Sequence, residues 1–485
     1  MRELLGPQPD LSTLVDAATL PWVPEQEVLD ALSLGVADDE ATDALARLRG
    51  GARVIVAGQQ PGVCGGPSLG LAKAAGALAL AAALRDRGVD AVAVFWLASE
   101  DHDHSEAERL FLPALDRFSV ALHHVALRPT GASLDRARVD AEDVGLRQIE
   151  QILQATWSGR FDPRILPRPD ETLAAASRRV LQLVFGGTGL LVVEPRDLSV
   201  AATALRQELM DARGAIQTAI ESATTRLEAA GFVPQLDRPT QNWSLFFTDE
   251  DGRRRRLATG PAAKALLTRA PHHVSSSVWT RPLVQQACLR PLAQVSGPSE
   301  IAYVAQIQGV VESLGLEPIR PWPRPRLVVT DARFRADAEF LGKNPSDLLD
   351  EEHPSWKESW PLAPDLSALS DAFRAAYPSL ARGEWSQGAN FLRSAGPRER
   401  HGWRRSLQGY LAAIEREHRR RTKPRRQAQQ RLREWQNPRG KPQDRCLSLA
   451  SLGADDAEDF GRRLIEATTT EPGALITIHR GTQAT

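Results

Sequence analysis

Two short apolar runs near the start of the chain predict buried β-strands. The segments RVIVAG (53–58) and AVAVFWLAS (91–99) are continuous and rich in β-branched or aromatic residues. Between them, the Gly/Pro-rich stretch over 59–67 predicts a loop and the Ala/Leu-rich stretch over 68–87 predicts a helix. Strand, loop, helix and strand in this order form a βαβ unit, which implies parallel strands and an α/β fold.

The same alternation continues along the chain. The run LLVVEP (190–195) predicts another strand, with a helix after it through about residue 231. LAQVSG (292–297) predicts a further strand, followed by a helix over 298–315. Four prolines interrupt residues 232–280, which predict a β-rich insertion. We therefore expect an α/β core over residues 1–330.

The pattern changes after residue 330. HPSWKESWPLAPD (353–365) is typical of a linker, and apolar residues then fall at intervals of 4, 3 and 4, the seam of a coiled coil or helix bundle: Trp403, Leu407, Tyr410 and Ile414. Pro424 is expected to kink or end this helix. From 398 to 441 the chain has 15 Arg or Lys residues and 4 Asp or Glu residues, so this stretch is basic. A solvated, charged helix face is a better explanation of this charge than nucleic-acid binding.

These patterns divide the chain into three parts. A helical, coiled-coil-like arm is expected over 331–435. The last part, 436–485, has a helical pattern near 455–468 and a strand pattern near 474–479, so we expect it to return to the core.

Composition excludes several classes of protein. The chain has 485 residues, a mass of 53.0 kDa and a net charge of −1, which argues against a nucleic-acid binder that uses its whole surface. Its three cysteines, Cys64, Cys288 and Cys446, lack CxxC spacing and predict neither a disulfide framework nor a thiolate zinc site. No apolar run suits a signal peptide or a membrane span, so we expect a cytoplasmic protein.

The first candidate site is the loop GQQPGVCGGP (58–67). Glycines between a strand and a helix let a backbone approach an anion, and the helix N-terminus offers free N–H groups. Lys73, two turns into the helix, then suits a phosphate or carboxylate. A plain tight turn explains the loop equally well, and a lone lysine is more often a surface residue.

The second candidate is the run Glu100-Asp101-His102-Asp103-His104, directly after a predicted strand. Ligands of open parallel sheets bind beyond the carboxyl ends of the strands. Alternate residues of the run suit a divalent metal or a general acid and base. The simpler interpretation is an acidic helix N-terminus.

The third candidate covers 281–303, where a strand again leads through Gly297 and Pro298 into a helix. Ser299 is a candidate N-cap and Glu300 lies in the first turn. A well-capped helix explains these two residues, but not the Arg and Gln side chains before the same sheet edge: Arg281, Gln285 and Arg290.

Together these motifs resemble the bacillithiol-biosynthesis cysteine-adding enzymes, the BshC family of cysteine ligases. The resemblance rests on GQQPGVCGGP, VFWLASEDHD (94–103), RPLVQ (281–285) and GPSEIAY (297–303), while PRGKPQDR (438–445) is similar to the family's C-terminal signature with Asp444 in place of Glu. It implies a Rossmann-like core with connecting-peptide insertions, a dimerising coiled coil, and a reaction that joins L-cysteine to glucosaminyl malate.

The chain also departs from the family pattern. Cys64 and Gly65 replace an apolar or aromatic residue and a threonine, so we do not expect Cys64 to be a nucleophile. Gln285-Gln286 stands where the family has Gln-Asp, so a divergent substrate is an open alternative.

The motifs and the resemblance give one set of candidate residues. Catalytic roles are expected for Lys73, Asp101, His102 and Asp103. Substrate-binding roles are expected for Gln59, Gln60, Gly62, Gly66, Pro67, Glu100, Arg281, Gln285, Gly297, Pro298, Glu300 and Tyr303.

A carboxylate must be activated before an amine can attack it. The resemblance implies ATP for this step, with a preactivated donor and a carrier as open alternatives, and no tightly bound metal is expected. Two other hypotheses remain. One is a metal-dependent hydrolase or nucleotidyltransferase that uses residues 101–104. The other is a non-enzymatic assembly or nucleic-acid-binding protein that uses the basic arm.

Overall fold

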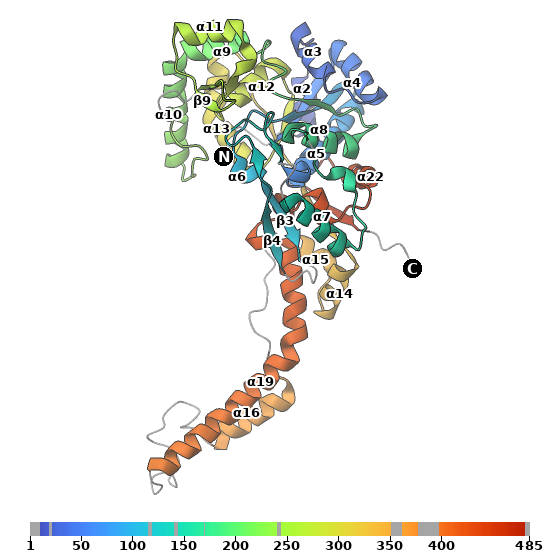
Figure 1. Cartoon of the computed structure of the whole chain (residues 1–485), viewed down its shortest axis with the longest axis vertical. Helices are drawn as coiled ribbons and strands as arrows, with labels where there is room; N and C mark the ends of the chain where they lie inside the picture. Colours follow the sequence, from blue (N-terminus) through green and yellow to red (C-terminus); the bar gives the residue numbers. More distant parts are fainter. Residues whose placement is uncertain are drawn as a thin grey trace. The chain divides into compact units, whose positions relative to one another are not determined.

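The structure is a computed structural model that describes residues 10–18, 22–114, 119–139, 144–168, 170–239, 244–350, 361–376 and 397–480. The chain divides into two compact units (Figure 1). The larger unit contains Met1–Asp331 and Gln436–Thr485, and the smaller one contains Ala332–Trp435.

A parallel sheet of five strands forms the centre of the larger unit. Its order is β12-β11-β1-β2-β7, and every neighbouring pair is parallel. The strands are β1 (Arg53–Gln59), β2 (Ala91–Leu97), β7 (Leu191–Val193), β11 (Ala293–Ser296) and β12 (Pro321–Pro323). The predicted α/β class with a parallel core is confirmed.

Helices cover both faces of this sheet. Val54 and Val56 of β1 pack in one apolar cluster with Val92 and Val94 of β2. The same cluster takes side chains from α3 (Gln26–Ser33), α4 (Asp39–Arg49), α12 (Arg281–Leu289) and α13 (Pro298–Ser313). Successive strand residues point to opposite faces, and α5 (Leu69–Arg85) packs against β1 and β2 on the other side.

The small residues of α5 explain how closely it approaches the sheet. Alanine and glycine fill most of its buried positions, and a Cβ on Gly76 would lie 2.9 Å from Pro325 Cδ and 3.4 Å from Val295 Cγ1. A larger side chain there would push the helix away from the ends of the strands.

The segment between β7 and β11 differs in detail from the expectation. One long helix was expected to follow β7, but a turn segment and two helices do so: α9 (Thr203–Asp211) and α10 (Arg213–Ala229). The insertion contains an antiparallel sheet of order β10-β8-β9 together with α11 (Pro261–Arg269). These strands are β8 (Leu245–Thr248), β9 (Arg254–Arg256) and β10 (Val274–Ser276).

The C-terminal segment completes the core. Strand β14 (Leu475–His479) pairs in parallel with β13 (Arg326–Thr330). A buried ion pair joins Arg324 to Asp444 of α20 (Gln443–Cys446) at 2.5 Å, with side chains 6% and 2% exposed. Asp444 Oδ2 also accepts the Leu327 N–H at 3.1 Å. Asp444 of the C-terminal signature therefore joins the last segment of the chain to Arg324 and to the start of β13.

Helices dominate the described part of the smaller unit. The main ones are α14 (Ala332–Phe340), α16 (Pro364–Ala376) and α19 (Pro397–Gln436). Helix α19 continues through Pro424 instead of ending there, and Figure 1 shows it changing direction along its length.

Only part of the predicted apolar seam can be described. Ile414 is 7% exposed and Tyr410 is 41% exposed. The side chains of Trp403 and Leu407, and most of the predicted linker, lie outside the described residues. Several α19 arginines form ion pairs within this unit, including Arg421 with Asp365 and Arg420 with Glu417.

In the part of the chain that the structure describes, no helix is long and apolar enough to cross a membrane.

Replacing Asp444 with alanine should leave the Arg324 guanidinium buried without its counter-charge. We expect Asp444→Ala to lower the free energy of unfolding by about 3–5 kcal/mol, measured by urea unfolding. Glu466→Ala is the matched control, because Glu466 pairs with Arg462 on an exposed helix face, and should change it by less than about 1 kcal/mol. Equal losses in both variants would contradict the assigned role of Asp444.

Candidate active site

The chain reverses its direction of winding at the carboxyl ends of β1 and β11. After β1 it passes through α5 to β2, on one side of β1. After β11 it passes through α13 to β12, on the opposite side. Such a switch point leaves a crevice between adjacent strand ends, where doubly wound α/β proteins bind ligands.

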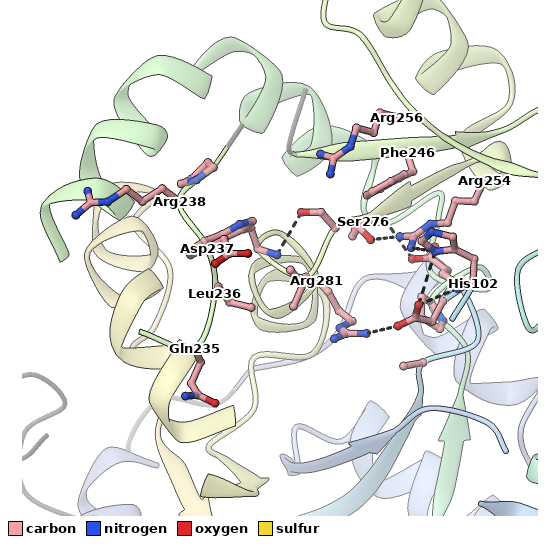
Figure 2. A pocket seen from close by; sticks show the side chains of 18 residues that line it. His102, Gln235, Leu236, Asp237, Arg238, Phe246, Arg254, Arg256, Ser276 and Arg281 are labelled. Atoms are coloured by element: carbon pink, nitrogen blue, oxygen red, sulfur yellow. Dashed lines mark hydrogen bonds and ion pairs between the residues drawn. The ribbon is translucent and has the colours of Figure 1, made fainter. Parts of the chain in front are cut away.

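A large cavity of about 470 Å³ lies beside this crevice. Its walls come from the residues after β2, the loop over 235–239, the small antiparallel sheet and the start of α12. Figure 2 shows His102, Phe246 and Arg254 on one side and Gln235 and Leu236 on the other, with Arg281 between them.

A smaller cavity of about 120 Å³ lies at the strand ends themselves. It contains seven of the predicted site residues: Gln59, Gln60, Asp101, Arg281, Gln285, Glu300 and Tyr303. Ala98, Asp101 and Arg281 line both cavities. The two cavities therefore lie on either side of Asp101 and Arg281.

Glu100 lies in the wall of the large cavity and forms an ion pair with a buried arginine that does not line this cavity. Its Oε1 lies 3.4 Å from Arg206 Nη2, and its Oε2 accepts the Ser276 N–H at 3.2 Å. The Arg206 side chain is 0% exposed. Burial raises the pKa of Glu100, while Arg206 and Arg254 oppose that rise. Sequence reasoning missed Arg206, because its helical pattern contains nothing unusual.

Asp101 and His102 are adjacent to the cations of the site. Asp101 Oδ2 lies 3.9 Å from Arg281 Nη1, and its Oδ1 lies 3.7 Å from His102 Nδ1. His102 Nδ1 is also 3.3 Å from Arg254 Nη1. Burial lowers the pKa of His102, and the Arg254 charge lowers it further, so its imidazole is neutral at pH 7.

Asp103 and His104 turn away from these two residues. Asp103 is the N-cap of α6 (His104–Ala107), and its carboxylate accepts the Glu106 N–H at 3.3 Å. His104 Nε2 lies 2.7 Å from the Ala132 carbonyl oxygen. Asp103 lines neither cavity, so the geometry favours capping over the catalytic role expected from the sequence.

The divergence of these side chains weakens the metal-enzyme hypothesis. Residues 101–104 do not converge on one point, because each pair of alternate side chains has separate partners. Among the described residues, no group of three or more His, Cys, Asp or Glu side chains is arranged to hold a metal ion.

Lys73 is a buried residue that positions the site. Its Nζ lies 2.7 Å from Glu300 Oε2, 2.9 Å from the Gly58 carbonyl and 3.1 Å from Gln59 Oε1. All three ammonium protons therefore have protein acceptors. Burial lowers the pKa of Lys73 while Glu300 opposes this. The surface-lysine interpretation is wrong, and the geometry favours a role in holding Glu300 over direct contact with a substrate.

The start of α13 also differs from the expectation. Gly297, not Ser299, is the N-cap, with Pro298 at the first helical position. Glu300 reaches back to accept the Gly297 N–H at 2.6 Å. Glu300 thus caps its own helix, binds Lys73 and lines the small cavity, whereas Gly297 and Pro298 line neither cavity and shape the turn.

The glycine-rich loop is closed instead of open to an anion. Gly62 exchanges backbone hydrogen bonds with the Ser177 hydroxyl, and Gly66 N–H donates to the Val63 carbonyl at 3.0 Å. Ser68 N–H donates to the Leu447 carbonyl at 2.9 Å. Gly66 has φ +74°, and a Cβ on Gly62 would lie 2.7 Å from Gly66 Cα, so packing explains both glycines.

The closed loop changes the expected roles of three residues. Gly62, Gly66 and Pro67 line neither cavity, so the geometry favours a structural role for them over substrate binding. Arg290 is a similar case. It lies at the far end of α12 from Arg281 and is exposed, so it does not join the site edge.

The insertion supplies residues that sequence reasoning missed. Arg254 lies 4.1 Å and Arg256 lies 5.5 Å from the centre of the Phe246 ring. Arg254 also donates to the Ser275 hydroxyl at 2.9 Å. The run of four arginines over 253–256 was the available signal, but the Pro-broken segment around it gave no reason to place it at the sheet edge.

The cysteines take no part in this chemistry. Cys64, Cys288 and Cys446 are free and buried. Burial raises the pKa of Cys64 and of Cys288 to about 12 and that of Cys446 to about 11. Their thiolates are scarce at neutral pH, which agrees with the expectation that Cys64 is not a nucleophile.

The fold is that of a Rossmann-like α/β protein, and its two neighbouring cavities lie at the switch point, where such proteins bind ligands. A family model described as the N-terminal Rossmann-like domain of the bacillithiol biosynthesis protein BshC matches residues 26–320. The chain belongs to the BshC family.

Several relatives carry the name "Putative cysteine ligase BshC". The Thermus thermophilus protein is 32% identical over 71% of this chain and 74% of its own length. The Koribacter versatilis protein is 33% identical over 57% of this chain and 55% of its own. The Geobacillus thermodenitrificans protein is 27% identical over 67% of this chain and 64% of its own length. In these last two comparisons the chain spans less than two thirds of its relative.

The contact between Arg254 and His102 can be tested by titration. Arg254→Gln removes the nearby positive charge, so we expect the pKa of His102 to rise while burial keeps it below the ordinary value of about 6.5. NMR titration of the imidazole measures this pKa. Arg256→Gln should raise it less, because Arg256 does not contact His102. A fall in the His102 pKa in Arg254→Gln would contradict the electrostatic assignment.

Proposed function

We propose that this protein joins the carboxyl group of L-cysteine to the amine of glucosaminyl malate, forming an amide bond in bacillithiol biosynthesis. One observation supports this most: two cavities of different size and charge meet at Asp101 and Arg281 in a chain of the BshC family. A two-substrate condensation needs such a junction. A cytoplasmic location, where thiols stay reduced, is part of the same proposal.

The large cavity suits an anionic sugar conjugate. Four arginines and three carboxylates line it. Arg206 compensates Glu100 from behind, and Arg238 is already paired with Glu228 at 2.8 Å. Arg254 and Arg256, both from β9, add two positive charges to one wall of the cavity. The two carboxylates of a malate group are suitable partners for guanidinium groups, which bind carboxylates in a bidentate manner.

The residues at the junction suit amide formation. Arg281 can hold an oxygen of the cysteine carboxyl group and so orient its carbon toward the large cavity. An amine that attacks this carbon must lose a proton, and Asp101 lies where it can accept it. The neutral imidazole of His102, 3.7 Å from Asp101, offers a second acceptor on the side of the large cavity.

The carboxyl group still needs a leaving group, and we propose ATP as its source. When bound, ATP supplies that leaving group for the carboxyl oxygen. The closed loop over 61–68 does not offer free N–H groups of Gly62, Gly66 or Ser68 to its phosphates. A preactivated donor remains the alternative.

Reconstitution tests this function directly. The purified protein is incubated with L-cysteine and glucosaminyl malate, with and without ATP and Mg²⁺, and the amide product is measured by mass spectrometry. Loss of bacillithiol and accumulation of glucosaminyl malate in a deletion strain is the matching result in cells. Absence of product with every donor would contradict the proposal.

The acidic run provides a pair of variants with opposite expected results. Asp101→Asn should lower turnover by about 10²–10⁴-fold with little change in the melting temperature, because it removes the proton acceptor and keeps the shape. Asp103→Ala should keep turnover but lower stability by about 0.5–2 kcal/mol, because it removes the α6 cap. Turnover and melting are measured on the same samples. The reverse result would exchange the two roles.

We also propose a homodimer formed through the helical region over 366–435. The support is the family resemblance and the apolar spacing that includes Tyr410, which is exposed, and Ile414, which is buried. Light scattering should give about twice the monomer mass of 53.0 kDa, and Tyr410→Arg should shift the population toward monomer. A monomer at micromolar concentration in the unaltered protein would refute this proposal.

A further inference from the structure

Two amide side chains that line the small cavity lack partners in the folded chain. Gln285 of α12 and Gln294 of β11 are only 6% and 8% exposed. Within the described residues, neither side-chain amide forms a hydrogen bond. A few convergent polar groups in a cavity wall are what fix the orientation of a ligand in a binding site. Their position in a cavity wall indicates that a polar ligand supplies these bonds.

The charges around the small cavity match a zwitterion. Arg281 provides one positive charge, and Asp101 and Glu300 provide two negative charges. Lys73 compensates one of these from behind, at 2.7 Å from Glu300 Oε2. The lining is therefore close to neutral but polarised, with a cation and two carboxylates facing the same space. An α-amino acid carries the complementary pair of charges on adjacent groups.

Glu300 and Asp101 each retain an oxygen for such a ligand. Glu300 Oε2 binds Lys73 and the Gly297 N–H, which leaves Oε1 for a new donor. Asp101 Oδ1 accepts the His102 and Asp103 N–H groups at 2.8 and 3.3 Å, while its Oδ2 has only the 3.9 Å contact with Arg281. Glu300 Oε1 can therefore bind an ammonium group, while Asp101 Oδ2 is left to accept the proton of the attacking amine.

The size of the cavity limits the ligand to a small amino acid. Its volume is about 120 Å³, whereas an apolar cavity of about 150 Å³ holds benzene. A sugar conjugate needs a pocket in the range of roughly 300–1,000 Å³, which the large cavity provides at about 470 Å³. The volume of the small cavity therefore suits L-cysteine better than it suits longer or aromatic amino acids.

We propose that the small cavity is the binding site of the free amino acid substrate, a small zwitterionic α-amino acid such as L-cysteine. Its ammonium group lies against Glu300, and its carboxylate lies against Arg281. The amides of Gln285 and Gln294 form hydrogen bonds to it and determine its affinity. This assignment rests on the proposed function, and it divides the two substrates between the two cavities.

The assignment has a structural consequence for the reaction. With its carboxylate at Arg281, the amino acid presents its reacting carbon at the place where the two cavities meet. The glucosamine amine can then approach from the large cavity. The ammonium group of the amino acid remains bound to Glu300, which keeps it from acting as a competing nucleophile.

Calorimetric titration with L-cysteine under reducing conditions tests the site, with and without glucosaminyl malate. Gln285→Leu and Gln294→Leu remove the amides at nearly constant volume, and each should weaken cysteine binding by about tenfold while leaving glucosaminyl malate affinity unchanged. The matched control is Gln286→Leu, a buried neighbour on the same helix that lines neither cavity. Arg256→Gln should have the opposite effect and weaken only glucosaminyl malate.

Binding of ligand analogues to the unaltered protein provides a second test of the small-cavity site. N-acetyl-L-cysteine lacks the ammonium group and L-methionine exceeds the cavity, so both should bind at least tenfold more weakly than L-cysteine. L-Serine, which is of similar size, should bind measurably. Melting temperatures of all variants establish that they are folded.

The outcomes separate this proposal from the proposed function. Unchanged cysteine affinity in both glutamine variants, or no cysteine binding at millimolar concentration in either condition, overturns the small-cavity site even if the protein makes the product. Selective loss of cysteine binding in these variants supports the site, even if reconstitution yields no amide and the ligase proposal fails.

Discussion

The ion pair between Lys73 and Glu300 is the contact on which the site depends most. It joins α5, which follows β1, to α13, which follows β11, so it ties together the two helices that leave the switch point on opposite sides. The same ammonium group holds the last residues of β1 through the Gly58 carbonyl and Gln59. Without this contact, Gln59 and Glu300 would lose their fixed positions in the small cavity.

The pair is stable because its surroundings compensate both charges. Lys73 lies inside a helix of alanines and glycines, where a lone ammonium group would be costly. Glu300 receives a second hydrogen bond from the Gly297 N–H at the helix N-terminus, where the macrodipole favours a carboxylate. Groups within the site therefore offset the free-energy cost of burying the lysine. A preorganised binding site requires such an arrangement.

The two cavities divide the electrostatics of the site into two regions. Arginines from the insertion make one wall of the large cavity cationic, while glutamines and paired charges make the small cavity polar and nearly neutral. Asp101 and Arg281 belong to both, so they face any two ligands that meet there. The insertion between β7 and β11 thus changes the charge of a site whose framework is the parallel sheet.

The sequence predicted the framework well and the details of the site less well. Continuous apolar runs such as AVAVFWLAS predict buried parallel strands, because few other structures accept them, and the polar residues after them then mark the sheet edge. The roles of Asp103 and Lys73 could not be predicted, because capping and burial depend on neighbours that only the fold supplies. Arg206 and Arg254 come from segments far away in sequence, so no local pattern connects them to Glu100 or His102.

The return of the C-terminal segment to the core has a consequence for how the protein is made. The Ser68 N–H donates to the Leu447 carbonyl, so one contact at the base of the glycine-rich loop joins residues separated by most of the chain, and β14 pairs with β13 across the smaller unit's sequence. A ribosome releases residues 332–435, a compact unit of their own, before it releases these partners. The separate pairing of β14 with β13 can therefore form only late in synthesis, and until then β13 exposes an unpaired edge of the kind that folds slowly and favours chaperone binding.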